Sequence, residues 1–162
     1  DDVDIVVNVQ GDEPELSGES IDLVIRLLQE NPDAVMSTLA VPIHSREMLN
    51  DPSCVKVVFD SLGRAMYFSR SPIPAARDWN DVLLEEDPPL FHQHVGLYAY
   101  RRDFLLELAQ MLPARVECLE SLEQLRVLDA GRTILVGVVD EATVGIDTPE
   151  DYARFVERTK SG

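Results

Sequence analysis

The sequence predicts an α/β sandwich with a mixed β-sheet, formed by one continuous domain of 162 residues. Two observations support this fold class. Apolar segments of strand length alternate along the chain with segments whose apolar residues recur at helical spacing, as in α/β folds. In addition, residues 55–69 contain two short strand-like runs around Ser61-Leu62-Gly63, which indicates an antiparallel hairpin and excludes a purely parallel sheet.

The first quarter of the chain supplies a strand, a helix and a second strand. The apolar run from Val3 to Val9 indicates a buried strand. Residues 20–30 place apolar side chains at helical spacing, and Asn31-Pro32 ends that helix. Residues 34–42 form the next predicted strand, and a short helical turn is expected at 46–49.

Residues 71–92 follow the hairpin and are rich in Pro, Asp and Glu, so we expect a long loop with a helical turn. Loops of this length are usually functional or mobile. The hairpin and this loop carry much of the aromatic content, including Tyr67, Phe68 and Trp79. Because aromatic residues are enriched in the cores of protein interfaces, the region around 55–92 is a candidate dimerisation subregion.

The second half of the chain repeats the alternation of strands and helices. A strand is expected at 95–100, helices at 103–110 and 118–130, a strand at 133–139 and a closing helix at 149–160. Gly131 is expected to end the second of these helices. Thr148 is well placed to cap the closing helix, with Pro149 at its first position.

The composition is that of an ordinary globular protein, but its net charge of -16 is strongly acidic. Such a charge argues against a nucleic-acid partner, which Lys and Arg would have to bind. No apolar run approaches the ~20 residues that span a bilayer, and the acidic first residues do not resemble a signal peptide. The two cysteines, Cys54 and Cys118, are expected to be free thiols in a reducing cytoplasm.

Two aspartates, Asp12 and Asp147, each follow a predicted strand. The carboxyl ends of strands are where open α/β sheets bind ligands. Two such carboxylates could share one hard cation such as Mg²⁺, which prefers carboxylate and phosphate oxygens. The alternative is that Asp12 caps a turn and Asp147 belongs to a helix-capping segment.

Polar residues at other strand ends are candidates for substrate contacts. Gln10 shares a strand face with Asp12. Arg70 follows a strand and could hold a carboxylate through two parallel hydrogen bonds, or it could form a surface ion pair. His94 and Tyr98 share a strand face, with Gly96 between them allowing close approach of a ligand. The alternative for His94 is a structural hydrogen bond, and no pair of histidines has convincing zinc spacing.

The predicted helix at 118–130 carries acidic and amide side chains at helical spacing. Glu120 and Gln124 fall on one face of this helix, while Leu119, Leu122 and Leu125 are expected to face the core. This polar face could bind a polyhydroxylated ligand or could simply be solvated.

Several of these segments together resemble a known family, the bacterial 3-deoxy-manno-octulosonate cytidylyltransferases, or CMP-KDO synthetases. The segments that carry the resemblance are Val7-Asn8-Val9-Gln10-Gly11-Asp12-Glu13-Pro14, Thr38-Leu39-Ala40-Val41-Pro42-Ile43, Tyr67-Phe68-Ser69-Arg70, His94-Val95-Gly96-Leu97-Tyr98, Leu119-Glu120-Ser121-Leu122-Glu123-Gln124-Leu125-Arg126 and Gly145-Ile146-Asp147-Thr148-Pro149-Glu150-Asp151. They occur in the family's order over nearly the whole chain.

The resemblance implies a nucleotide-diphospho-sugar-transferase-like (Rossmann-like) α/β/α sandwich and a cytoplasmic homodimer that uses CTP, KDO and Mg²⁺ in lipopolysaccharide synthesis. It implies that Asp12 and Asp147 are catalytic metal ligands. It further implies a set of substrate-binding residues: Gln10, Arg70, His94, Tyr98, Glu120 and Gln124. No nucleic acid or membrane is an expected partner.

The chain departs from the family pattern in two places. Family members open with a strand and a loop resembling Pro-Ala-Arg-x-x-Ser-x-Arg-x-Pro-Gly-Lys, and no such segment occurs here. We therefore expect the chain to be N-terminally truncated and inactive by itself. Cys118 stands where the family often has His. The alternatives are a cytidylyltransferase for another sugar acid, such as a nonulosonic acid, and a non-catalytic binding or dimerisation module.

Overall fold

The computed structural model describes residues 3–9 and 17–140, and the predicted closing helix at 149–160 lies outside them. The described elements are β1 (Ile5–Asn8), α1 (Gly18–Glu30), β2 (Ala34–Pro42), α2 (Arg46–Asn50), β3 (Lys56–Phe59), β4 (Ala65–Ser69), the 3₁₀ turn η1 (Asp81–Leu84), β5 (His92–Arg101), α3 (Arg102–Leu108), α4 (Arg115–Glu120), α5 (Gln124–Asp129) and β6 (Thr133–Val138). Most of the strands and helices predicted for this part are confirmed; one predicted helix is wrong.

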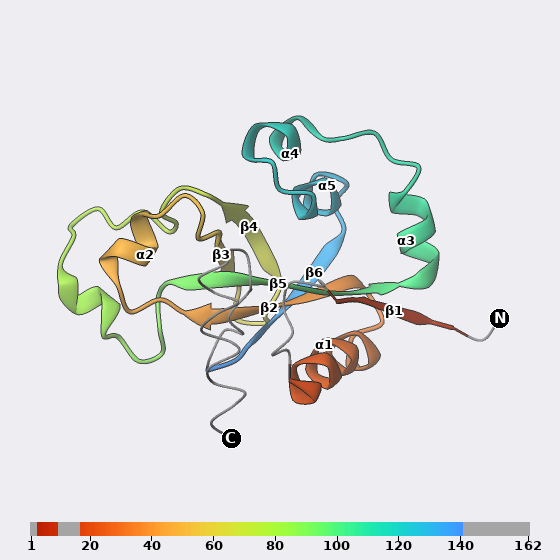
Figure 1. The fold of residues 1–162 in the computed structure, drawn as a ribbon, viewed down its shortest axis with the longest axis horizontal. Helices are drawn as coiled ribbons and strands as arrows, with labels where there is room; N and C mark the ends of the chain where they lie inside the picture. The colour runs from red at the N-terminus through yellow and green to blue at the C-terminus, as the bar shows by residue number, and fades with distance from the viewer. Residues whose placement is uncertain (1–2, 10–16, 141–162) are drawn as a thin grey trace, which may run out of the picture.

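The strands form one mixed sheet in the order β4-β3-β5-β2-β6, with β1 paired to β5 (Figure 1). Only the β2–β6 pair is parallel among the described strand pairs, and the predicted hairpin is confirmed as the antiparallel pair β3–β4. β5 is the centre of this arrangement, because β2 lies along one edge of it while β1 and β3 share the other.

Helices cover both faces of the sheet, which confirms the sandwich (Figure 1). On one face, α1 contributes Val24 and Leu28 to a core that also contains Leu39 of β2. On the other face, α3 and α5 pack with Met36 of β2 and Phe68 of β4. Alternate residues of β2 therefore enter different cores, and the strand reads as a nearly continuous apolar run because both of its faces are buried.

The helix predicted at 118–130 is wrong: the structure has two short helices, α4 and α5, with a break at Ser121. Ser121 adopts the left-handed conformation (φ 54°), and the Leu122 amide donates to the Glu117 carbonyl, which ends α4 in a Schellman-type turn. The chain direction changes there, so Leu122 enters the core while Leu119 is 84% exposed instead of facing the core as expected.

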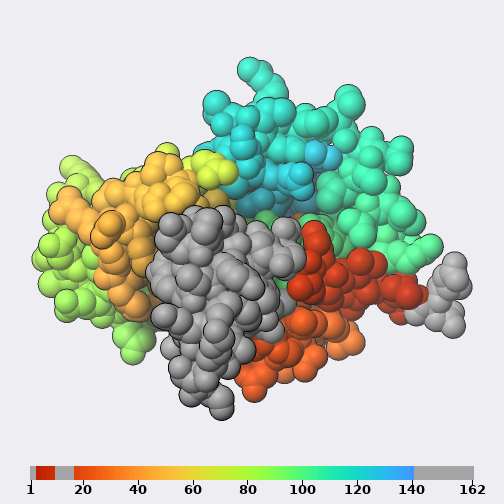
Figure 2. All heavy atoms as spheres, in the orientation of Figure 1, coloured from red at the N-terminus to blue at the C-terminus, as the bar shows by residue number. Residues whose placement is uncertain are grey.

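The long loop is not loosely attached, because it packs on a small core of its own. Leu84 and Phe91 join Leu49 of α2 in this core, with Trp79 against its edge. Figure 2 shows α2 and this loop gathered at one end of the molecule, away from β1 and α3 at the other. Phe68, counted above among candidate interface aromatics, is fully buried under the sheet and contributes nothing to a surface.

Candidate functional site

The structure brings three of the predicted site residues together. His94, Tyr98 and Gln124 line a single pocket of about 450 Å³, between β5, the residues just before β3 and the turn that joins α4 to α5. Arg70 and Glu120 are not among the residues that line it, but the Arg70 guanidinium hydrogen-bonds to the carbonyl of Ser121, which does line it. Gln10, Asp12 and Asp147 lie outside the described residues, so their roles stay predictions.

A bulge in β5 shapes the wall of this pocket. Thr38 of β2 faces Tyr98, but the next residue, Leu39, faces Val95, so β5 carries extra residues between these two pairs. Gly96 lies in the bulge and lines the pocket. The rings of His94 and Tyr98 lie on the same side, with centroids 5.4 Å apart.

His94 is a neutral side chain in this site. It is 9% exposed, its Nε2 lies 2.9 Å from the Thr38 hydroxyl, and its ring meets Phe68 edge-on at 5.0 Å. Burial lowers the pKa of His94 from 6.5 to about 3, because the charged imidazolium would lose its hydration. Any ligand in this pocket would therefore meet His94 as an uncharged, hydrogen-bonding side chain and not as a positive charge.

Gln124 contributes a hydrogen-bond donor that the described residues leave unused. The side chain is 5% exposed, and its Nε2 has no hydrogen-bond partner in the described part of the chain. A buried donor without a partner costs about 1–3 kcal/mol. A polar ligand in the pocket would remove that penalty, so Gln124 is the strongest structural indication that this pocket binds one.

Arg70 and Glu120 each hydrogen-bond to the backbone of the other residue. Glu120 accepts from the Ser69 hydroxyl (2.7 Å) and the Arg70 amide (2.9 Å). The Arg70 guanidinium donates to the carbonyls of Glu120 (2.7 Å), Pro52 (3.1 Å) and Ser121 (3.4 Å). These bonds use three of its five N–H groups and leave two for a ligand. The structure thus gives both residues a structural role, and their contact with substrate stays a prediction.

Sequence reasoning missed Lys56, which holds the backbone of Arg70 in place. Lys56 is fully buried, and its Nζ donates to the carbonyls of Asp51 (2.8 Å), Cys54 (2.5 Å) and Arg70 (2.6 Å). Burial lowers the pKa of its ammonium group. The residue ties the segment before β3 to the end of β4. A lone lysine within an otherwise apolar strand was the available signal.

A second missed feature is the ion pair that joins α4 to α5. Glu117 accepts from Arg126 through both carboxylate oxygens, one of them at 2.8 Å from Nε, and also from the Ala114 amide at 2.9 Å. The hydrogen bonds from Arg126 hold the pKa of Glu117 below its usual range. Because the pair spans the break at Ser121, it fixes the turn from which Gln124 enters the pocket.

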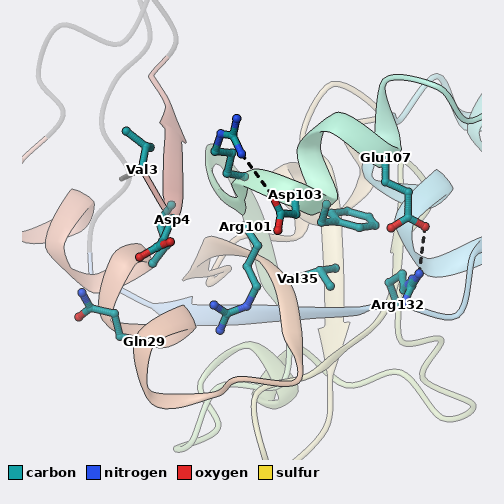
Figure 3. Close-up of a pocket in the computed structure, with 11 residues that line it drawn as sticks. Val3, Asp4, Gln29, Val35, Arg101, Asp103, Glu107 and Arg132 are labelled. Atoms are coloured by element: carbon teal, nitrogen blue, oxygen red, sulfur yellow. Dashed lines mark hydrogen bonds and ion pairs between the residues drawn. The ribbon is translucent and has the colours of Figure 1, made fainter. Parts of the chain in front are cut away.

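A larger hollow of about 650 Å³ lies at the opposite end of the sheet, between β1, α1 and α3, and contains none of the predicted site residues (Figure 3). Most of its charged groups are already engaged. Arg132 pairs with Glu107 at 2.9 Å, a contact marked by a dashed line in Figure 3. Arg102 pairs with Asp103 at 3.3 Å. Arg101 donates to carbonyls at and beyond the end of α1.

Within residues 3–9 and 17–140, no group of three or more His, Cys, Asp or Glu side chains could hold a metal ion. In the same residues, no helix has both the length and the apolar character needed to cross a membrane. A metal site with three or more such side chains would therefore have to use residues beyond the described part, where Asp12 and Asp147 lie.

Comparison with known proteins points to one family. The model of the family described as "Cytidylyltransferase" matches residues 1–134. A 3-deoxy-manno-octulosonate cytidylyltransferase of Rhodopirellula baltica is 48% identical over 162 residues, which are 99% of this chain and 65% of that protein. One of Geotalea uraniireducens is also 48% identical, over 98% of this chain and 65% of its own length. The chain thus spans just under two thirds of the length of these relatives.

Two solved structures resemble the fold. CMP:2-keto-3-deoxy-manno-octonic acid synthetase complexed with CTP superposes with a TM-score of 0.88 at 35% identity, over 99% of this chain and 63% of that one. The 4-diphosphocytidyl-2C-methyl-D-erythritol synthase of Anaerococcus prevotii has a TM-score of 0.56 at 15% identity, over 97% of this chain and 59% of that one, and this likeness concerns the fold alone.

Proposed function

The chain belongs to the cytidylyltransferase family, and from that premise we propose that the whole protein transfers CMP from CTP to 3-deoxy-D-manno-octulosonate (KDO). The products would be CMP-KDO and pyrophosphate, for lipopolysaccharide biosynthesis in the cytoplasm. The names of the similar proteins and the CTP bound to the similar structure support the substrates. The observation in this chain that carries the proposal is the pocket lined by Gln124, whose buried amide nitrogen has no hydrogen-bond partner among residues 3–9 and 17–140.

The proposed reaction joins the anomeric hydroxyl of KDO to the α-phosphorus of CTP, and the bond to the pyrophosphate leaving group breaks. The protein's contribution would be mainly to hold the two reactants in line. His94, Tyr98 and Gln124 would orient the sugar in the pocket, with Gln10, Arg70 and Glu120 as further contacts.

Asp12 and Asp147 are the proposed Mg²⁺ ligands. A pair of carboxylates suits this ion, which takes its other ligands from phosphate oxygens and water. When bound, Mg²⁺ would neutralise phosphate charge.

Pyrophosphate release tests the activity, measured with CTP, Mg²⁺ and KDO. We expect release from a form extended to the length of the relatives and none from the 162-residue chain alone. A panel of sugar acids, including a nonulosonic acid, separates KDO from the alternative substrates. If the extended form releases no pyrophosphate with any of them, the proposal is wrong and a non-catalytic module is favoured.

We also propose that the protein is a homodimer that associates through the hairpin and the long loop. An apolar hollow of about 500 Å³ there is lined by Met66, Tyr67, Ile73 and Leu90, and Met66 is 66% exposed. Light scattering at two salt concentrations tests this, because a charge of -16 per chain opposes association at low salt. Met66→Glu should weaken the dimer, whereas Leu112→Glu, at an exposed residue between α3 and α4, should not. A monomer at both salt concentrations would contradict the proposal.

A further inference from the structure

Thr38 makes an unusual set of contacts in the middle of the sheet. The residue is fully buried in β2. Its hydroxyl oxygen lies 3.0 Å from the Val95 carbonyl, 2.8 Å from the Leu97 carbonyl and 2.9 Å from His94 Nε2. The bulge in β5 turns these three groups toward a single hydroxyl.

The number of available protons decides whether His94 donates a hydrogen bond to Thr38 or accepts one from it. A hydroxyl group has one proton to donate, and a carbonyl oxygen can only accept. If Thr38 donated to His94, both carbonyls would face its lone pairs at hydrogen-bond distance with no proton between them. In the favourable arrangement the single Thr38 proton is shared between the carbonyls of Val95 and Leu97, so His94 must donate from Nε2 to the Thr38 oxygen.

We propose that Thr38 holds His94 as the neutral Nε2–H tautomer, so that the Nδ1 lone pair serves as an acceptor for a hydroxyl group of the ligand in the pocket. The ligand part of this inference rests on the proposed function. In a neutral imidazole with a proton on Nε2, Nδ1 can only accept. His94 lines the pocket, and no residue within 3–9 and 17–140 donates to its Nδ1.

The surroundings of His94 favour a neutral ring. Its aromatic neighbours are Phe68 and Tyr98, and the cause of its lowered pKa is burial alone. The side chains that line the pocket therefore include an acceptor at His94 and an amide donor at Gln124 that has no partner in the described part of the chain. A hydroxyl group can donate to His94 Nδ1 and accept from Gln124. An ionised carboxylate can only accept, so its oxygens would face the lone pair of Nδ1 without a proton between them. On this side the pocket should select hydroxyl groups, and the carboxylate of a sugar acid should bind elsewhere.

Nitrogen-15 NMR of the histidine rings in the 162-residue chain tests the tautomer without any activity. We expect the Nε2 resonance of His94 at a protonated position and Nδ1 at an unprotonated one near pH 7, assigned with His94→Gln. Thr38→Val, which keeps the shape but removes the hydroxyl, should give a mixture of tautomers or a change of tautomer. Thr38→Ser should restore the wild-type pattern.

Ser37→Ala is the matched control. It also removes a buried hydroxyl from β2, but one that donates to the Val24 carbonyl at 2.6 Å and does not touch His94. This variant should keep the wild-type tautomer. A proton on Nδ1 in the wild-type chain would overturn the proposal, and so would a Thr38→Val variant that is folded and keeps the wild-type tautomer.

The ligand part is tested in the form extended to the length of the relatives. Adding KDO should move the Nδ1 resonance toward a hydrogen-bonded position, and Thr38→Val should raise the KM for KDO roughly tenfold while the KM for CTP stays unchanged. Binding of KDO that shifts other resonances but leaves Nδ1 unmoved would overturn the acceptor role alone. Absence of KDO binding would overturn the proposed function together with the ligand part, while the tautomer result would stand.

Discussion

The buried neutral histidine makes the stability of this fold depend on pH in a way that can be calculated. The pKa of His94 is about 3 in the folded chain against 6.5 for an ordinary histidine. The unfolded chain therefore binds a proton below pH 6.5, whereas the folded chain does not until about pH 3. The stability that depends on a neutral His94 is fully present above pH 6.5 and is lost progressively as the pH drops toward 3.

The size of the effect follows from the two pKa values. Each unit between the pH and the unfolded-state pKa contributes about 1.4 kcal/mol while the folded state stays unprotonated. A pH of about 5 lies roughly 1.5 units below the unfolded-state pKa and well above the folded-state pKa. His94 alone should therefore lower the free energy of unfolding by about 2 kcal/mol between pH 7 and pH 5.

Urea unfolding of the wild-type chain and of His94→Gln, each at pH 7 and pH 5, isolates this contribution. The other ionisable groups are the same in both chains, so their effects cancel in the difference. The wild type should lose about 2 kcal/mol more than the variant over this range. Equal losses in the two chains would refute the reasoning, because His94 would then have an ordinary pKa in the folded state.

Three further predictions concern the site and its support. Gln124→Met removes a buried donor that has no described partner, so the free energy of unfolding should stay unchanged or rise by about 1 kcal/mol in urea unfolding. Steady-state kinetics should show a higher KM for KDO. A large loss of stability would mean that the amide is already paired. Glu117→Gln should cost about 3 kcal/mol of stability, because that carboxylate is 9% exposed and pairs with Arg126. Glu107→Gln breaks a half-exposed pair and should cost less than about 1 kcal/mol. Similar costs for the two variants would contradict the assignment of Glu117 as a buried support. In the extended form, Asp12→Asn and Asp147→Asn should each slow pyrophosphate release roughly a hundredfold or more, and a near-normal rate at saturating Mg²⁺ would remove that residue from the metal site.

Local sequence signals were sufficient where one segment decides its own structure. The apolar run of β2 and the turn between β3 and β4 appear at the predicted places, because strand periodicity and turn residues act over a few neighbours. The break at Ser121 was not predictable in this way. No glycine or proline marks it, and the left-handed turn is stabilised by packing of Leu122 and by the bond between Glu117 and Arg126, which lie nine residues apart.

The candidate site shows the same division. The sequence by itself determined which residue types could carry the chemistry, and His94, Tyr98 and Gln124 do line one pocket. It also contained every side chain of the supporting network, including Lys56 and Thr38.

Only the tertiary structure decided what those supporting side chains do. Lys56 is held by two carbonyls of the turn before β3 and by one carbonyl after β4, and Arg70 is held by the carbonyls of Pro52, Glu120 and Ser121. The tautomer of His94 is set by Thr38, 56 residues away. Hydrogen bonding depends on distances of about 3 Å between groups, and distances between residues so far apart in the chain exist only after the sheet has assembled.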